Sequence, residues 1–128
     1  MTVVTDKYRE TKEYHLVYGE LITAARYRGT VMYQELAQIM GLPLSGNHMQ
    51  RELGQILGEI SEDEHSRGRP MLSAAAVGTS GMPGAGFFGL ANDLGSLDDD
   101  SPEGRRQFWE SERAALYDVW RRALNTSE

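Results

Sequence analysis

Hydrophobic positions recur at helical spacing through the first half of the chain. A stripe that contains Tyr14, Val17 and Leu21 predicts an amphipathic helix over residues 6–27, which ends near Gly29. Residues 30–32 predict a short extended piece, and residues 33–40 predict a second helix. Gly41 follows that helix directly and is a typical stop signal.

A third helix is predicted after a turn at residues 42–46, which contains Pro and Gly. We expect Asn47 to be its N-cap, because Asn side chains accept hydrogen bonds from the first free backbone N–H groups of a helix. Its buried stripe is formed by Met49, Leu53, Ile56, Leu57 and Ile60. The charged stretch 62–70 that follows ends in a helix breaker and predicts an exposed connection.

The second half of the chain predicts a strand, a loop and two helices. Residues 71–78 are short, apolar and uncharged and predict a buried strand. The loop 79–86 holds three Gly and one Pro, and the phenylalanines that follow it predict a short core-anchored helix at 87–94. Residues 97–102 predict a solvated linker, and residues 102–124 predict a last helix.

The order of these elements is typical of a winged helix-turn-helix. The sequence therefore predicts a mainly α fold with a small β component, in which the helix-turn-helix core covers about residues 14–78. A length of 128 residues suits one domain, with the C-terminal helix added to that core. Trp109 and Trp120 share one stripe of the last helix, which favours a place in the core, with a homodimer or protein-partner surface as the alternative.

Composition excludes several classes of protein. The chain has no Cys, so it holds neither a disulfide framework nor a thiol nucleophile nor a thiolate zinc site. No apolar run approaches the ~20 residues that a membrane span needs. The first residues lack the features of a secretion signal, so we expect a cytoplasmic protein. We predict no metal and no cofactor.

The charge balance limits binding to nucleic acid. The net charge is −6, and the acid is concentrated in the second half, because residues 1–60 hold six cations and seven anions. Such a chain is a poor non-specific binder of phosphate backbones. A local basic surface formed by Arg26, Arg28 and Arg51 in the nearly neutral first half would favour DNA.

Polar side chains on the third helix are the candidate DNA-reading residues. Asn47, His48, Gln50, Arg51 and Gln55 lie off its apolar stripe. Asn and Gln match the adenine edge and Arg matches the guanine edge in the major groove. The competing interpretation is that these residues form an ordinary solvated helix face.

The stretch Gly29-Thr30-Val31-Met32-Tyr33-Gln34-Glu35-Leu36-Ala37 resembles the DNA-binding domain of the alkylguanine-DNA alkyltransferases and alkyltransferase-like proteins. The resemblance implies that Tyr33 contacts a DNA phosphate. It also places Arg51-Glu52-Leu53-Gly54 on the family's recognition helix, with Arg51 as the arginine that fills the space of a flipped base.

The family's Pro-Cys-His-Arg active site falls on Pro70-Met71-Leu72-Ser73. The nucleophile and its base are therefore missing, and a Met thioether cannot perform thiolate chemistry. The sequence thus predicts a non-catalytic protein that binds double-stranded DNA through Tyr33, Asn47, His48, Gln50 and Arg51, with the loop 79–86 as the wing.

Two other functions stay open from the sequence. The chain could be a protein-interaction or regulatory module in which the helix-turn-helix is only a scaffold and the acidic second half meets a partner. A metal-dependent or hydrolytic activity would need Glu64 and His65 to converge in a pocket. Arg67 and Arg69 nearby could bind an anion, but we favour ion pairs with Glu62 and Glu64.

Overall fold

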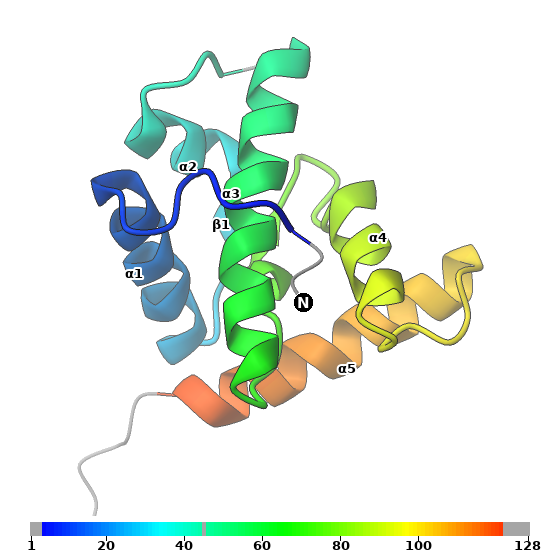
Figure 1. The fold of residues 1–128 in the computed structure, drawn as a ribbon. Coiled ribbons are helices and arrows are strands. Elements are labelled where there is room, and N and C mark those ends of the chain that lie inside the picture. Colours follow the sequence, from blue (N-terminus) through cyan, green and yellow to red (C-terminus); the bar gives the residue numbers. More distant parts are fainter. Residues whose placement is uncertain (1–3, 45, 122–128) are drawn as a thin grey trace, which may run out of the picture.

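The computed structural model describes residues 4–44 and 46–121, and these residues are mainly helical with one small parallel sheet (Figure 1). In chain order the elements are α1 (Lys12–Arg26), β1 (Val31–Met32), α2 (Tyr33–Met40), α3 (Gly46–Ser66), the 3₁₀-helix η1 (Leu72–Ala75), β2 (Ala76–Val77), α4 (Ala85–Asp93) and α5 (Pro102–Trp120). No helix in these two ranges combines the length and the apolar character that crossing a membrane requires.

Helix α1 is shorter at its N-terminus than the sequence predicts. It begins at Lys12, and the side chain of Thr11 caps it by accepting a hydrogen bond of 3.1 Å from the N–H of Tyr14. Residues 4–11 are not helical, and Glu10 has a left-handed φ of 69°. The helix predicted over 6–27 was therefore wrong before residue 12, because this segment crosses α3 instead of extending α1 (Figure 1).

Helix α2 has the predicted bounds, whereas α3 differs from the prediction at both ends. Gly41 ends α2 in the left-handed conformation, with φ of 72°. Helix α3 begins at Gly46, so Asn47 lies inside its first turn and the predicted N-cap was wrong. At its other end α3 continues to Ser66, through residues that were expected to form an exposed connection.

Two carboxylates near the end of α3, those of Glu62 and Glu64, are buried because they have partners elsewhere in the chain. Glu64 is fully buried and accepts two hydrogen bonds from Arg69, of 2.8 and 2.7 Å, and one from the hydroxyl of Tyr18. Glu62 is also buried and pairs with Arg9 at 3.0 Å. The predicted pairing of Arg69 is confirmed. The prediction of a solvated connection was wrong at Glu62 and Glu64, whereas residues 65–68 are exposed as expected.

The predicted strand at 71–78 is mostly a 3₁₀ turn. Residues 71–77 are all buried, as expected, but only Ala76 and Val77 pair with β1. This pairing is parallel, and the chain after β2 turns through a loop closed by a 3.0 Å hydrogen bond from Gly78 N–H to the Met82 carbonyl. Among the described residues no strand follows that loop, which leads directly into α4.

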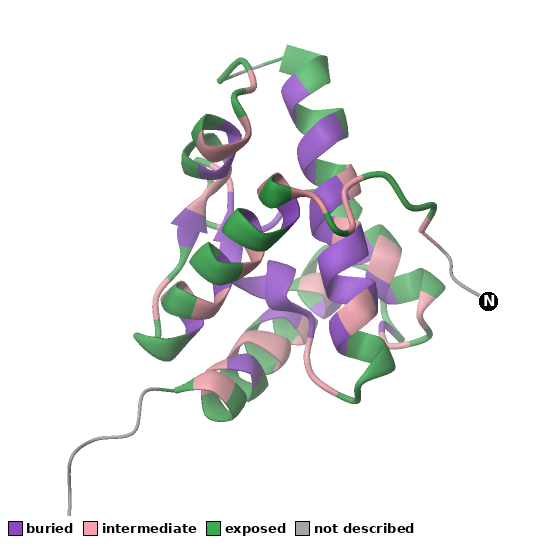
Figure 2. Ribbon diagram, turned by 60° about the vertical axis from the view of Figure 1, so that its left-hand side comes forward, coloured by how far each residue is buried: buried purple, intermediate pink, exposed green. Residues whose placement is uncertain are grey.

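The core lies between α1, α3, η1 and α5, which contact one another, and buried stretches of the ribbon appear in purple in Figure 2. Trp109 is buried, and its indole N–H donates a 2.9 Å hydrogen bond to the carbonyl of Ala74. Glu112, the charged residue on the apolar stripe of α5, accepts the N–H of Met71 at 2.9 Å. Trp120 is only half-buried. Helix α5 ends there, before the predicted residue 124, because Arg121 leaves helical geometry with ψ of 142°. Residues 122–124 lie outside the described range.

Candidate nucleic-acid interface

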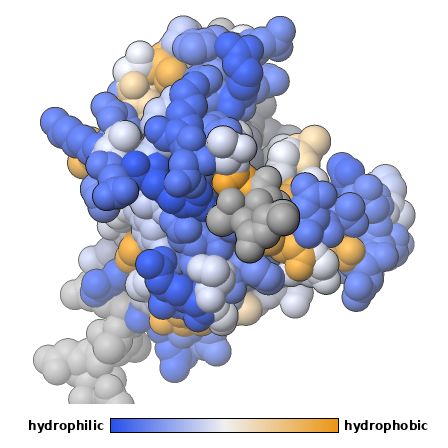
Figure 3. Space-filling model, viewed as in Figure 1, coloured by the Kyte–Doolittle hydropathy of each residue, from blue (hydrophilic) through white to orange (hydrophobic). Residues whose placement is uncertain are grey.

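The first turns of α3 present a polar edge to solvent. Asn47, His48, Gln50 and Arg51 are all exposed, while Met49 between them is buried. Helix α2 packs behind α3 with its own buried side chains, Leu36 and Ala37. The corresponding region of Figure 3 is largely hydrophilic. We call Asn47, His48, Gln50 and Arg51 the polar edge.

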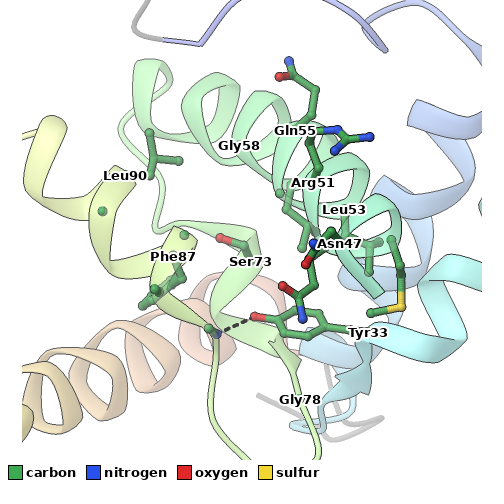
Figure 4. A pocket seen from close by; sticks show the side chains of 18 of the residues that line it. Tyr33, Asn47, Arg51, Leu53, Gln55, Gly58, Ser73, Gly78, Phe87 and Leu90 are labelled. Atoms are coloured by element: carbon green, nitrogen blue, oxygen red, sulfur yellow. Dashed lines mark hydrogen bonds between the residues drawn. The ribbon is translucent and has the colours of Figure 1, made fainter. Parts of the chain in front are cut away.

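A groove of about 1270 Å³ runs beside this edge, between α3 and α4. Figure 4 shows Arg51 and Gln55 on the α3 side and Phe87 and Leu90 on the α4 side. Hydrophobic surface is visible in this region in Figure 3. Its lining residues include one cation, Arg51, and one anion, Asp93.

Glycines form much of the groove wall. Gly54 on α3 and Gly86 and Gly89 on α4 line it, and a Cβ built on any of these three would have no neighbour within 4 Å. A Cβ on Gly58 would lie 3.6 Å from the side chain of Val4, which also lines the groove. The groove therefore exposes helix backbone and already accommodates one aliphatic side chain at the Gly58 position.

Tyr33 lies at the end of the groove near Asn47 (Figure 4). Its hydroxyl oxygen accepts a 2.7 Å hydrogen bond from the N–H of Gly84, the residue that precedes α4. Burial raises the pKa of Tyr33, so the hydroxyl keeps its proton at neutral pH. No acceptor for that proton is found within residues 4–44 and 46–121, so the hydroxyl can still donate to a ligand.

The side chain of Arg51 is exposed although a carboxylate lies nearby. Two-thirds of its side chain is exposed, and its Nε lies 3.7 Å from Oε2 of Glu52. Glu52 itself is nearly covered and is held by Lys7, whose Nζ lies 2.7 Å from the other carboxylate oxygen. One guanidinium nitrogen of Arg51 also lies 3.2 Å from Nδ1 of His48. The acidic neighbour of Arg51 is thus already paired.

Two expectations about this face need correction. Gln55 does not point freely to solvent, since its amide donates to the carbonyl of Thr5 at 2.5 Å and to Glu59 at 2.7 Å. Arg26 and Arg28 do not join Arg51 in one basic surface. The end of α1 and the start of α3 lie at opposite ends of the molecule in Figure 1.

Glu64 and His65, the residues considered for a metal-dependent or hydrolytic activity, do not converge in a pocket. Glu64 is fully buried against Arg69, while the adjacent His65 is exposed. Ser73 lines the groove, and its hydroxyl accepts a 2.7 Å hydrogen bond from the hydroxyl of Ser61. In the part of the chain that the structure describes, no cluster of three or more His, Asp or Glu side chains is placed to hold a metal.

Sequence reasoning missed the groove and the segment over α3. The signal for the groove was the spacing of Gly54 and Gly58, one helical turn apart, together with Gly86 and Gly89 in α4. Without coordinates, nothing indicated that these two glycine pairs line one groove.

No protein-family model, curated protein or solved structure matches this chain.

Proposed function

We propose that this protein is a non-catalytic DNA-binding protein in which α2 and α3 form a helix-turn-helix and α3 enters the major groove. The observation that carries the proposal is the polar edge itself. Its four side chains are exposed on consecutive turns of a helix that α2 braces from behind. A recognition helix reads bases with residues in its N-terminal turns, which is where these four lie.

The chemistry of the edge suits base reading. The amides of Asn47 and Gln50 can each pair with an adenine, donating to N7 and accepting from the N6 amine. The guanidinium of Arg51 can donate two hydrogen bonds to a guanine. Asn47 and Arg51 are four residues apart and therefore project from the same face of α3.

Tyr33 and the loop before α4 would bind the DNA backbone. The free proton of the Tyr33 hydroxyl is a suitable donor to a phosphate oxygen at the end of the groove. The loop before α4 would serve as the wing; it ends at Gly84, two residues earlier than the predicted 79–86, and the strands beside it are parallel instead of forming a hairpin. These contacts would set the register of α3 on the duplex.

The test is fluorescence anisotropy with labelled duplexes, with and without an alkylated guanine, across a salt series. We expect Arg51→Ala to weaken binding at least fivefold, because one bidentate base contact contributes about 1–3 kcal/mol. Arg106→Ala is the matched control, since Arg106 is an exposed arginine on α5 near Glu110. Salt-insensitive binding, or no binding of the wild type to any duplex, overturns the proposal.

A second candidate function is recognition of a protein segment, and the groove between α3 and α4 is the observation that favours it. Bare glycine backbone beside Phe87 and Leu90 suits an extended segment with aliphatic side chains, and Val4 already lies this way against Gly58. Gly89→Leu would place a side chain in the groove from its α4 wall, where a Cβ has no neighbour within 4 Å. Loss of a protein partner in this variant, with DNA binding unchanged, would favour this function over the first.

A further inference from the structure

Residues 4–11 form a strap that crosses α3 and is held there mainly by carboxylates (Figure 1). Helix α3 presents four acidic side chains to this strap: Glu52, Glu59, Glu62 and Asp63. The strap binds these carboxylates through its backbone N–H groups and through the cations Lys7 and Arg9. Its position therefore depends on charge and on hydrogen bonds more than on apolar burial.

Glu59 fixes the middle of the strap. This carboxylate is fully buried and accepts the backbone N–H groups of Lys7, Tyr8 and Arg9 at 3.1, 2.9 and 2.8 Å. Three successive N–H groups around one anion form a nest, an arrangement that binds negative charge strongly. The backbone at residue 7 is thereby held beside the outer surface of α3.

This placement brings Lys7 to Glu52, directly beside the polar edge. The Lys7 ammonium lies 2.7 Å from Oε1 of Glu52, and the hydroxyl of Tyr8 donates to the same oxygen. Hydrogen bonds from Lys7 and then Tyr8 lower the pKa of Glu52, which stays ionised. Its second oxygen lies 3.7 Å from the Nε of Arg51.

We propose that Lys7 is a positioning residue for DNA binding, and that the strap switches the polar edge on by supplying Lys7 as the counter-charge of Glu52. With Lys7 in place, the charge of Glu52 is shared, and its ion pair with the exposed Arg51 is long, at 3.7 Å, so Arg51 can leave it to meet a base or a phosphate. When the strap leaves α3, Glu52 loses Lys7 and Tyr8, so it draws Arg51 from 3.7 Å into a closer ion pair and repels the DNA backbone. The inference rests on the proposed function for its DNA consequence, but not for the rearrangement of Arg51.

The first experiment needs no DNA and follows the Arg51 side-chain Nε–H signal by NMR. Lys7→Gln should shift this signal and slow its exchange with water, since the ion pair of Arg51 Nε with Glu52, 3.7 Å in the wild type, becomes closer when Lys7 no longer shares the carboxylate. The double variant Lys7→Gln/Glu52→Gln should return the signal to its wild-type position. Lys12→Gln is the matched control, because Lys12 is exposed and has no ion pair within the described ranges. An Arg51 signal that is unchanged in Lys7→Gln overturns the inference.

The second experiment measures duplex affinity in the same variants. Lys7→Gln should weaken binding about fivefold, and adding Glu52→Gln should restore it to within about twofold of the wild type. If Lys7 instead contacted a phosphate directly, the second substitution would not rescue binding, and the salt dependence would fall by about one counterion. That result overturns the positioning role.

Strap release is tested with Glu59→Gln, which removes the anion from the nest. We expect faster amide hydrogen exchange at residues 7–9, a shifted Arg51 signal and weaker DNA binding, all in one variant. Full amide protection at these residues in Glu59→Gln would show that the nest does not hold the strap, and would overturn the switch. If the wild type binds no duplex, the proposed function fails, while the Arg51 and exchange measurements still decide whether the strap controls Arg51.

Discussion

Gly104, in the first turn of α5, provides a sharp test of how the linker packs on that helix. A Cβ built at this position would lie 2.7 Å from the Cβ of Asp99 and would collide with the Asp99 carbonyl oxygen. Because the obstacle includes backbone, we take the upper part of the overpacking range, about 3 kcal/mol. Alanine gains roughly 1 kcal/mol of helix propensity, so Gly104→Ala should destabilise the fold by about 2 kcal/mol.

The same substitution at Gly19 is the matched control, and it should have the opposite effect. Gly19 lies in the middle of α1, is exposed, and has no atom within 4 Å of its built Cβ. Gly19→Ala should therefore stabilise the protein by about 1 kcal/mol. The gap between the two variants is then about 3 kcal/mol, or roughly 10 °C in Tm. Urea unfolding followed by tryptophan fluorescence, to which the buried Trp109 contributes, measures it, and equal stability of the two variants would refute the close approach of Asp99.

Three further predictions concern buried polar groups. Glu64→Gln should lower the free energy of unfolding by about 3 kcal/mol in urea titrations, because Arg69 and Tyr18 lose a buried carboxylate; a loss below 1 kcal/mol would contradict this. Burial, and then hydrogen bonds to carboxylates, raise the pKa of Tyr8 and Tyr18 from 10.0 to about 12. Because the unfolded chain loses these protons at lower pH than the folded protein does, the free energy of unfolding should be constant up to about pH 10 and fall between about pH 10 and 12. Stability that already falls between pH 8 and 10 would argue against these hydrogen bonds. Trp109→Phe should cost about 2 kcal/mol in the urea assay, since a carbonyl of η1 loses its donor, and a neutral effect would speak against that bond.

Local signals in the sequence predicted the helices where they were strong. Helix α2 has the predicted bounds because Gly41 adopts the left-handed conformation that ends a helix without strain. The start of α5 at Pro102 was predicted as well, and there the side chain of Ser101 accepts the N–H of Gly104 at 3.1 Å. These features depend on a few neighbouring residues, so a sequence pattern is enough to identify them.

Long-range pairing accounts for most of the errors. The charged end of α3 looked solvated because the partners of its carboxylates, Arg9 and Tyr18, are 46 to 53 residues away in the chain. The segment before α1 looked helical because nothing local indicated that its N–H groups bind Glu59. A charge run predicts exposure only when no distant residue neutralises it.

The candidate site was predicted in part. The apolar stripe of α3 correctly indicated which of its residues face away from the core, and Asn47, His48, Gln50 and Arg51 are exposed in the structure. The groove beside them could not be predicted, because it depends on how α4 lies against α3. The same holds for the contact of Lys7 with Glu52, which depends on the path of the strap.

The most direct test of the central claim is an NMR titration of the ¹⁵N-labelled protein with a short duplex at low salt. If α3 enters the major groove, the amide signals of residues 46–51 move progressively, and those of α5 stay in place. Adding salt should reverse the shifts, because phosphate neutralisation contributes to the affinity. A titration in which residues 46–51 do not respond, or in which α5 responds instead, would contradict DNA recognition by the polar edge.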